Sequence, residues 1–265
     1  MTTNDPTSLF SLEGVTAAVV GASSGIGRSL SLAYARAGAT VYAAARRVDR
    51  LEELASEAPD GRIIPHEVDV CRESDVAGFI DRIEQDGRVA TVVLNAAGLF
   101  SYTPPPIPDE EFAKVLDVNL MGTWRVLLAF GEHLKRANRP GSLITIGSSC
   151  TTFTVAPSNH AYFASKGGVE NLVRWMAADL ADSDIRVNLI APGWIETDMV
   201  ETALSREGRV TILEEHTPLK RIGTTEDVTG AGLFLASEAS RYVTGITLLV
   251  DGGLALNRVW NIRPT

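Results

Sequence analysis

Short apolar runs alternate with segments of helical periodicity along this chain. Residues 15–20 form an apolar, β-prone run that ends at a glycine, which is typical of a strand buried in a parallel sheet. A helical pattern over residues 28–37 follows and stops at Gly38, and Thr40–Ala45 then predicts a second strand. Because this alternation continues through the chain, we expect an α/β fold with one doubly wound parallel sheet.

Composition and charge narrow the function classes. The chain has 265 residues, of which 45% are hydrophobic, and no linker or repeat divides it, so we expect one domain over residues 1–265. Its net charge of −9 argues against nucleic acid as a partner. No apolar run approaches the roughly 20 residues that a membrane span needs, and residues 1–11 do not resemble a signal peptide, so we expect a cytoplasmic protein. The cysteines Cys71 and Cys150 and the four histidines show no metal-ligand spacing, so we predict no metal site.

The turn after the first predicted strand has the composition of a phosphate-binding loop. Strand, glycine-rich turn and helix follow in the order that a pyrophosphate site requires, because glycines let the backbone approach and the helix N-terminus supplies amide donors. The second predicted strand completes a βαβ unit. We therefore predict that a dinucleotide binds at Gly21, Ser23, Ser24, Gly25, Ile26 and Gly27.

The residues after the second strand indicate which dinucleotide is bound. An NAD site usually places Asp or Glu there, whereas arginine suits the 2′-phosphate of NADP. In this chain Arg46 and Arg47 follow Ala45, with no acid before Asp49. Arginine can hold a phosphate through two hydrogen bonds, and positive charge at a helix start is otherwise unfavourable. We predict that Arg46 and Arg47 favour NADP(H) over NAD(H).

Tyr162 and Lys166 lie four residues apart and share one face of a predicted helix. A free phenol titrates near about 10, and a neighbouring ammonium favours the phenolate. At about 4 Å and an effective dielectric constant of about 20, the attraction is about 4 kcal/mol, or roughly three pKa units. We predict that Lys166 lowers the pKa of Tyr162 enough for acid–base catalysis at neutral pH.

These features and several further segments resemble the short-chain dehydrogenase/reductase family over about residues 12–253. Segment 94–98 is similar to the family's Asn-Asn-Ala-Gly segment, with Ala96 replacing the second asparagine, and Val20 stands where the family commonly has threonine. The resemblance implies a seven-stranded Rossmann fold. It also implies a catalytic tetrad and further cofactor contacts. The tetrad is Asn119, Ser149, Tyr162 and Lys166, and the contacts are Asp69, Val70, Asn95, Ala96, Ala97, Gly98, Tyr162, Lys166, Pro192, Gly193, Ile195 and Thr197.

The resemblance implies an oxidoreductase that interconverts a ketone and a secondary alcohol. Ser149 and Tyr162 would donate hydrogen bonds to the substrate oxygen, and Tyr162 would exchange a proton with it. Lys166 would also hold the nicotinamide ribose, and Asn119 would position a water in a proton relay. We expect residues 99–109 and a helical flap over residues 197–218 to enclose the substrate. Candidates for an apolar wall are Phe100, Tyr102, Phe153, Trp194 and Met199.

The substrate stays open at this point. The chain is similar to 3-oxoacyl-[acyl-carrier-protein] reductases in residues 218–223, but Asp179, Asp182 and Asp184 precede the predicted sixth strand, where such enzymes bind their acidic carrier through basic residues. We therefore favour a free ketone or secondary alcohol, as in carbonyl reductases. The alternatives are a 3-oxoacyl-[acyl-carrier-protein] reductase, an NAD-dependent sugar or steroid alcohol dehydrogenase and, more distantly, a non-catalytic nucleotide-binding subunit.

The resemblance also implies a homodimer or homotetramer. Relatives commonly assemble through the two long helices that we expect here at about residues 109–137 and 159–181. Candidate residues for these surfaces are Trp124, Phe130 and Trp175, and a core role is an equal alternative for each. The tail 256–265, with Trp260, extends beyond the last family motif.

Overall fold

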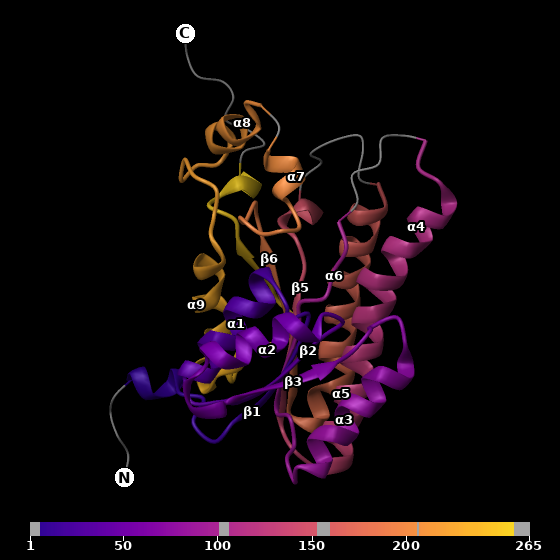
Figure 1. The fold of residues 1–265 in the computed structure, drawn as a ribbon, viewed down its shortest axis with the longest axis vertical. Helices are drawn as coiled ribbons and strands as arrows, with labels where there is room; N and C mark the ends of the chain where they lie inside the picture. Colours follow the sequence, from indigo (N-terminus) through magenta and orange to yellow (C-terminus); the bar gives the residue numbers. More distant parts are fainter. Residues whose placement is uncertain (1–5, 101–105, 153–159, 206, 257–265) are drawn as a thin grey trace.

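The computed structural model describes residues 6–100, 106–152, 160–205 and 207–256. Its centre is a seven-stranded sheet in the order β3-β2-β1-β4-β5-β6-β7, in which neighbouring strands are parallel. The doubly wound parallel sheet expected from the sequence is confirmed (Figure 1). The strands are β1 (Thr16–Val20), β2 (Thr40–Ala45), β3 (Ile63–Glu67), β4 (Val92–Asn95), β5 (Gly141–Ile146), β6 (Ile185–Pro192) and β7 (Thr247–Val250).

Helices cover both faces of the sheet (Figure 1). One face carries α1 (Gly25–Arg36), α2 (Val48–Glu57) and α9 (Thr225–Ala236), and the other carries α3 (Glu73–Gln85), α5 (Gly122–Ala137) and α6 (His160–Leu180). Strand β1 shows why the strands are apolar throughout. Ala17 and Val19 belong to the core beneath α1 and α9, whereas Ala18 and Val20 belong to the core on the opposite face. A strand buried on both faces needs apolar side chains at every position.

The helix expected over residues 109–137 is interrupted. It consists of α4 (Asp109–Leu116), a π-helical turn at Asp117–Met121 and α5. A π turn inserts one extra residue per turn, and such turns occur often at functional sites. Asn119 lies in this turn and is fully buried.

Two short helices, α7 (Glu201–Leu204) and α8 (Arg209–His216), follow β6 beyond the carboxyl ends of the strands, at the top of Figure 1. They occupy the segment that the sequence predicts as a helical flap. Short 3-10 turns lie at Pro6–Phe10, Pro59–Gly61, Ser149–Thr152, Ala181–Ser183, Glu238–Ser240 and Leu254–Leu256. Within the described ranges, no helix has the length and apolar character needed to cross a bilayer.

The candidate surface residues divide into core and surface. Phe130 is fully buried in the core beneath α5, so of the two roles that the sequence left open for it, the structure shows the core role. Trp124 on α5 and Trp175 on α6 are exposed by 41% and 67%. Trp260 and the tail beyond residue 256 lie outside the described residues.

Candidate active site

A groove runs along the carboxyl edge of the sheet, where the strand order reverses between β1 and β4. Parallel α/β sheets bind ligands at this edge. Its wall is built from the ends of β1, β2, β4, β5 and β6 and from α6. The predicted cofactor contacts that line it are Gly21, Ser23, Ser24, Gly25, Ile26, Gly27, Arg46, Arg47, Asp69, Val70, Ala96, Ala97, Gly98, Tyr162, Lys166, Pro192, Gly193, Ile195 and Thr197.

Asn95 is the predicted contact that the structure places behind the wall. It is 1% exposed, and its side-chain amide donates to Thr123 Oγ1 at 2.8 Å and accepts from the backbone N–H of Ala97 at 3.4 Å. Asn95 therefore shapes the end of β4, and the neighbouring residues 96–98 face the groove.

The glycine turn between β1 and α1 lies close to the next strand end. Gly21 has a φ of +85°, and a Cβ there would lie 2.5 Å from the backbone nitrogen of Ala97, so only glycine fits. Arg47 reaches back over this turn: its guanidinium donates to Ser23 Oγ at 2.9 Å and to Ser24 Oγ at 2.8 Å. The first turn of α1 and an arginine therefore face the same end of the groove, as a phosphate site requires.

Tyr162 and Lys166 extend from the first turns of α6 into the other end of the groove. The Lys166 Nζ atom lies 5.7 Å from the centroid of the Tyr162 ring and donates to the backbone oxygen of Ile146 at 2.8 Å. Burial lowers the pKa of Lys166 to about 8 and raises the pKa of Tyr162 above its ordinary value. The predicted lowering of the Tyr162 pKa is therefore wrong for this structure, because desolvation by burial is the largest influence on this phenol and raises its pKa.

The two serines at the end of β5 take different places. Ser149 is 2% exposed, begins the 3-10 turn after β5 and is not part of the groove wall. Ser148 lines the groove together with Tyr162, and its hydroxyl acts to lower the pKa of Tyr162, against the larger effect of burial. The structure thus brings Ser148 to Tyr162 and Lys166, and the sequence reasoning missed it. The signal was the Ser-Ser pair itself, of which only the second serine was considered.

Asn119 anchors the floor beneath these groups. Its side-chain oxygen accepts from the backbone N–H of Leu99 at 2.6 Å, and its side-chain nitrogen donates to Leu99 O at 2.9 Å and to Ser165 Oγ at 3.0 Å. Ser165 in turn donates to the backbone oxygen of Tyr162 at 2.7 Å. Asn119 therefore fixes the chain after β4 and, through Ser165, the start of α6.

Comparisons with known proteins agree with this geometry. A family model described as enoyl-(acyl carrier protein) reductase matches residues 21–255. The 3-oxoacyl-[acyl-carrier-protein] reductase of Thermotoga maritima is 35% identical over 248 residues, 92% of this chain and 99% of that protein. A solved short-chain type dehydrogenase/reductase from Mycobacterium marinum is 35% identical, with a TM-score of 0.90 over 94% of this chain and 98% of that one. This chain belongs to the short-chain dehydrogenase/reductase family.

Other relatives in this family act on sugars and sugar acids. The galactitol 2-dehydrogenase of Rhizobium johnstonii is 36% identical over 92% of this chain and 96% of its own. A solved gluconate 5-dehydrogenase from Burkholderia cenocepacia, in complex with NADP and tartrate, is 31% identical, with a TM-score of 0.86 over 94% of this chain and 98% of its own. Together these relatives show that the chain is an NAD(P)-dependent oxidoreductase acting on alcohol or ketone groups.

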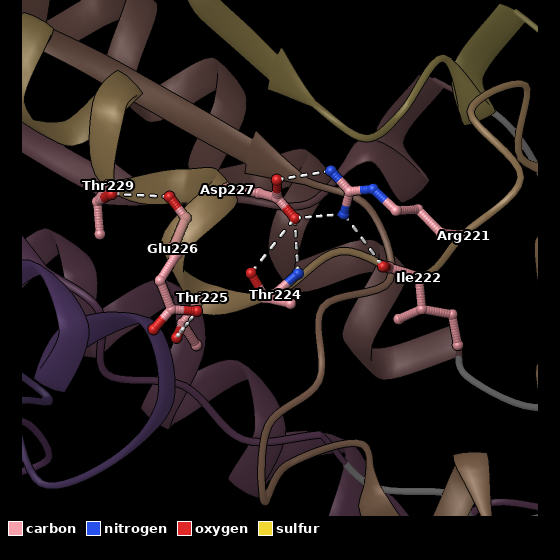
Figure 2. A network of polar contacts seen from close by, with 7 residues as sticks. All are labelled: Arg221, Ile222, Thr224, Thr225, Glu226, Asp227 and Thr229. Atoms are coloured by element: carbon pink, nitrogen blue, oxygen red, sulfur yellow. Dashed lines mark hydrogen bonds and ion pairs between the residues drawn. The ribbon is translucent and has the colours of Figure 1, made fainter.

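In this short-chain dehydrogenase/reductase, the segment just after the predicted flap is tied to α9 beside the groove. Figure 2 shows the Arg221 guanidinium facing Asp227, with hydrogen bonds of 2.5 and 2.7 Å. Asp227 also accepts from the backbone N–H of Thr224 at 2.8 Å, which caps α9, and Arg221 holds the pKa of Asp227 well below its usual range. Residues 221–227 form a corner between the flap and α9, and Gly223 in this corner pairs with Ile195 of the groove wall. The corner therefore holds one side of the groove in place.

Three of the five candidates for the apolar wall lie within the described residues. The Phe100 ring packs edge-on against Tyr162, with 5.0 Å between ring centroids, and Met199 lines the groove. Trp194 is partly buried and lies outside the groove wall, while Tyr102 and Phe153 lie outside the described residues. No group of three metal-ligating side chains occurs in the part of the chain that the structure describes.

Proposed function

We propose that this chain is an NADP(H)-dependent oxidoreductase that interconverts a ketone and a secondary alcohol, with Tyr162 as general acid and base. One observation carries the proposal. Tyr162, Lys166 and Ser148 meet at one end of the groove whose other end presents Arg46 and Arg47 beside the glycine turn. Such a groove places a proton donor and a dinucleotide site in reach of one substrate.

The residues present fit a nicotinamide dinucleotide. The glycine turn would hold the pyrophosphate at the N-terminus of α1, and Arg46 and Arg47 would hold the 2′-phosphate. Asp69 and Val70 would lie against the adenine, and Lys166 against the nicotinamide ribose. When bound, the cofactor supplies or accepts the hydride. Arginine at the end of β2, with no carboxylate there, supports NADP(H) over NAD(H).

The protonation states favour ketone reduction. Because burial raises the pKa of Tyr162, the phenol keeps its proton at neutral pH and can transfer it to an alkoxide as it forms. Ser148, in the role that the sequence assigned to Ser149, would donate a hydrogen bond to the same oxygen. Lys166, with a pKa of about 8, exchanges protons near neutral pH and can help restore the tyrosine proton.

Two relatives support alternative substrate classes. The Thermotoga maritima reductase supports 3-oxoacyl thioesters, and the galactitol 2-dehydrogenase supports polyols. The acidic residues before β6 argue less strongly against an acyl-carrier-protein substrate than the sequence suggested. Asp182 and Asp184 precede the amino end of β6, whereas the groove lies at the carboxyl ends of the strands. Repulsion of an acidic carrier protein at that end of this subunit would act far from the groove.

The test is NADPH oxidation by the purified protein against free ketones, ketoses and acetoacetyl thioesters, with NADH in parallel. Turnover of free ketones with NADPH supports the proposal, and preference for thioesters would replace it with the 3-oxoacyl reductase function. Cofactor binding without turnover of any of these carbonyls would point to a non-catalytic nucleotide-binding protein.

We also propose a homodimer or homotetramer in which α5 and α6 form one contact. The exposed indoles of Trp124 and Trp175 on these helices support this, since large exposed apolar side chains often mark interfaces. Light scattering of the wild type and of a Trp124→Glu, Trp175→Glu double variant tests it, and an unchanged mass would exclude these helices as the contact.

A further inference from the structure

Asp198 links the flap to the cofactor end of the groove. Its Oδ2 atom pairs with Arg50 Nη1 at 2.7 Å, although the two residues are 148 positions apart in the sequence. The preceding residue, Thr197, packs against the glycine turn: a Cβ on Gly25 would lie 3.0 Å from the Thr197 methyl group. The segment after β6 therefore reaches across the groove and carries a carboxylate to α2.

This carboxylate lies among the positive charges of the proposed 2′-phosphate site. Arg50 stands one helical turn after Arg47, whose guanidinium rests on the hydroxyls of Ser23 and Ser24. Arg50 and, more weakly, Arg47 hold the pKa of Asp198 below its ordinary value, so the carboxylate lies in the field of both arginines. Asp198 is thus a negative charge on the surface, paired with an arginine one helical turn from the place where a phosphate dianion would bind.

We propose that Asp198 sets the preference between NADP(H) and NAD(H) by neutralising Arg50. The inference rests on the proposed NADP(H) site at Arg46 and Arg47. The 2′-phosphate of NADP is the group that distinguishes the two cofactors, and it carries close to two negative charges. Asp198 opposes that phosphate and engages a cation that would otherwise attract it, so it weakens NADP(H) binding and leaves NAD(H) binding almost unchanged.

Substituting Asp198 and Arg50, singly and together, changes the local charge in each direction and then restores it. A unit charge about 10 Å from a doubly charged phosphate changes the binding constant about fourfold in water of low ionic strength. Asp198→Asn should therefore tighten NADPH binding about fourfold, and Arg50→Gln should weaken it about fourfold. The double variant should return close to wild type, because it removes one charge of each sign.

Other charges near Arg50 stay constant through the series. Asp49 and Glu53 on α2 also face Arg50, and neither is changed. Glu196 supplies the matched control: it is an exposed acid on the same segment, held through its backbone N–H to Gly223 O at 2.9 Å. Glu196→Gln removes the same charge, two residues away, from an acid that is not among those acting on Arg50, and should alter NADPH affinity less than Asp198→Asn does.

The experiment measures dissociation constants of NADPH and NADH by fluorescence titration for the wild type and these four variants, at low and at high salt. NADH affinity reports whether each variant still folds its binding site. A higher ratio of NADPH to NADH affinity in Asp198→Asn, which shrinks at high salt, supports the inference. An unchanged ratio overturns it, and if both cofactors also bind more weakly, Asp198 has a role in holding the flap that is common to both cofactors. A wild type that binds neither cofactor would overturn the proposed function itself.

Discussion

Alanine substitutions at the two neighbouring serines separate two assignments of the substrate-oxygen donor. The family resemblance favours Ser149, whereas the structure places Ser148 in the groove wall together with Tyr162. Ser148 Oγ also accepts from the backbone N–H of Cys150 at 3.2 Å, which fixes the orientation of the hydroxyl. We expect Ser148→Ala to impair catalysis and Ser149→Ala to spare it.

The size of the effect follows from what each hydroxyl does. Removing one preplaced donor to a developing oxyanion costs about 10²- to 10³-fold in kcat, or about 3–4 kcal/mol of transition-state stabilisation. Ser149 is buried behind the wall, so its loss should act on stability, by about 1 kcal/mol, and change kcat less than about threefold.

The assay is steady-state reduction of the best ketone substrate, with NADPH affinity and thermal unfolding measured for both variants. Both should bind NADPH like the wild type, because neither side chain belongs to the proposed phosphate or adenine contacts. A loss of kcat confined to Ser149→Ala would refute the reasoning and restore the assignment that the family resemblance implies.

Three further predictions follow from the same geometry. Tyr162→Phe should retain NADPH binding and lose at least about 10²-fold in kcat, and retained turnover would exclude Tyr162 as the proton donor. Because burial depresses the pKa of Lys166 to about 8, the native state binds fewer protons there than the unfolded state between pH 8 and 10, so stability rises with pH in that window. Relative to Lys166→Met, the wild type should gain about 2 kcal/mol of unfolding free energy from pH 8 to pH 10 in urea titrations, and parallel pH profiles would contradict the buried lysine. Asp227→Asn should cost about 1 kcal/mol through the lost cap of α9, seen as a Tm lower by about 2–4 °C, and an unchanged Tm would mean that the Arg221 corner is not stabilising.

The fold and the glycine turn could be predicted because their determinants are local. An apolar strand, a glycine with positive φ and the first turn of a helix follow one another within a dozen residues. Each of them constrains its neighbours directly. The same holds for Arg47, which follows β2 and meets a turn already tied to that strand by the bond from Gly21 N–H to Ala44 O at 2.8 Å. These parts of the site could be predicted because contacts between residues close in sequence or on adjacent strands determine their positions.

Ser148 was missed because the family resemblance points to the second serine of the Ser-Ser pair, and the first was not considered. The two serines are neighbours in the sequence, so the resemblance alone does not decide which of them faces the groove. Counting from the strand gives a different answer: Ile146 ends β5, and Ser148 follows two residues later at the edge where the groove opens.

The charges of the site depend on burial and on long-range contacts, which sequence spacing does not reveal. The four-residue spacing correctly put Lys166 beside Tyr162, but the ammonium is directed to Ile146 O, and burial then shifts both pKa values toward the neutral forms. A neutral tyrosine is ready to donate, which is the state that ketone reduction needs, whereas alcohol oxidation must first remove that proton. The pH dependence should therefore differ between directions: reduction should hold constant up to about pH 8, and oxidation should still rise above it.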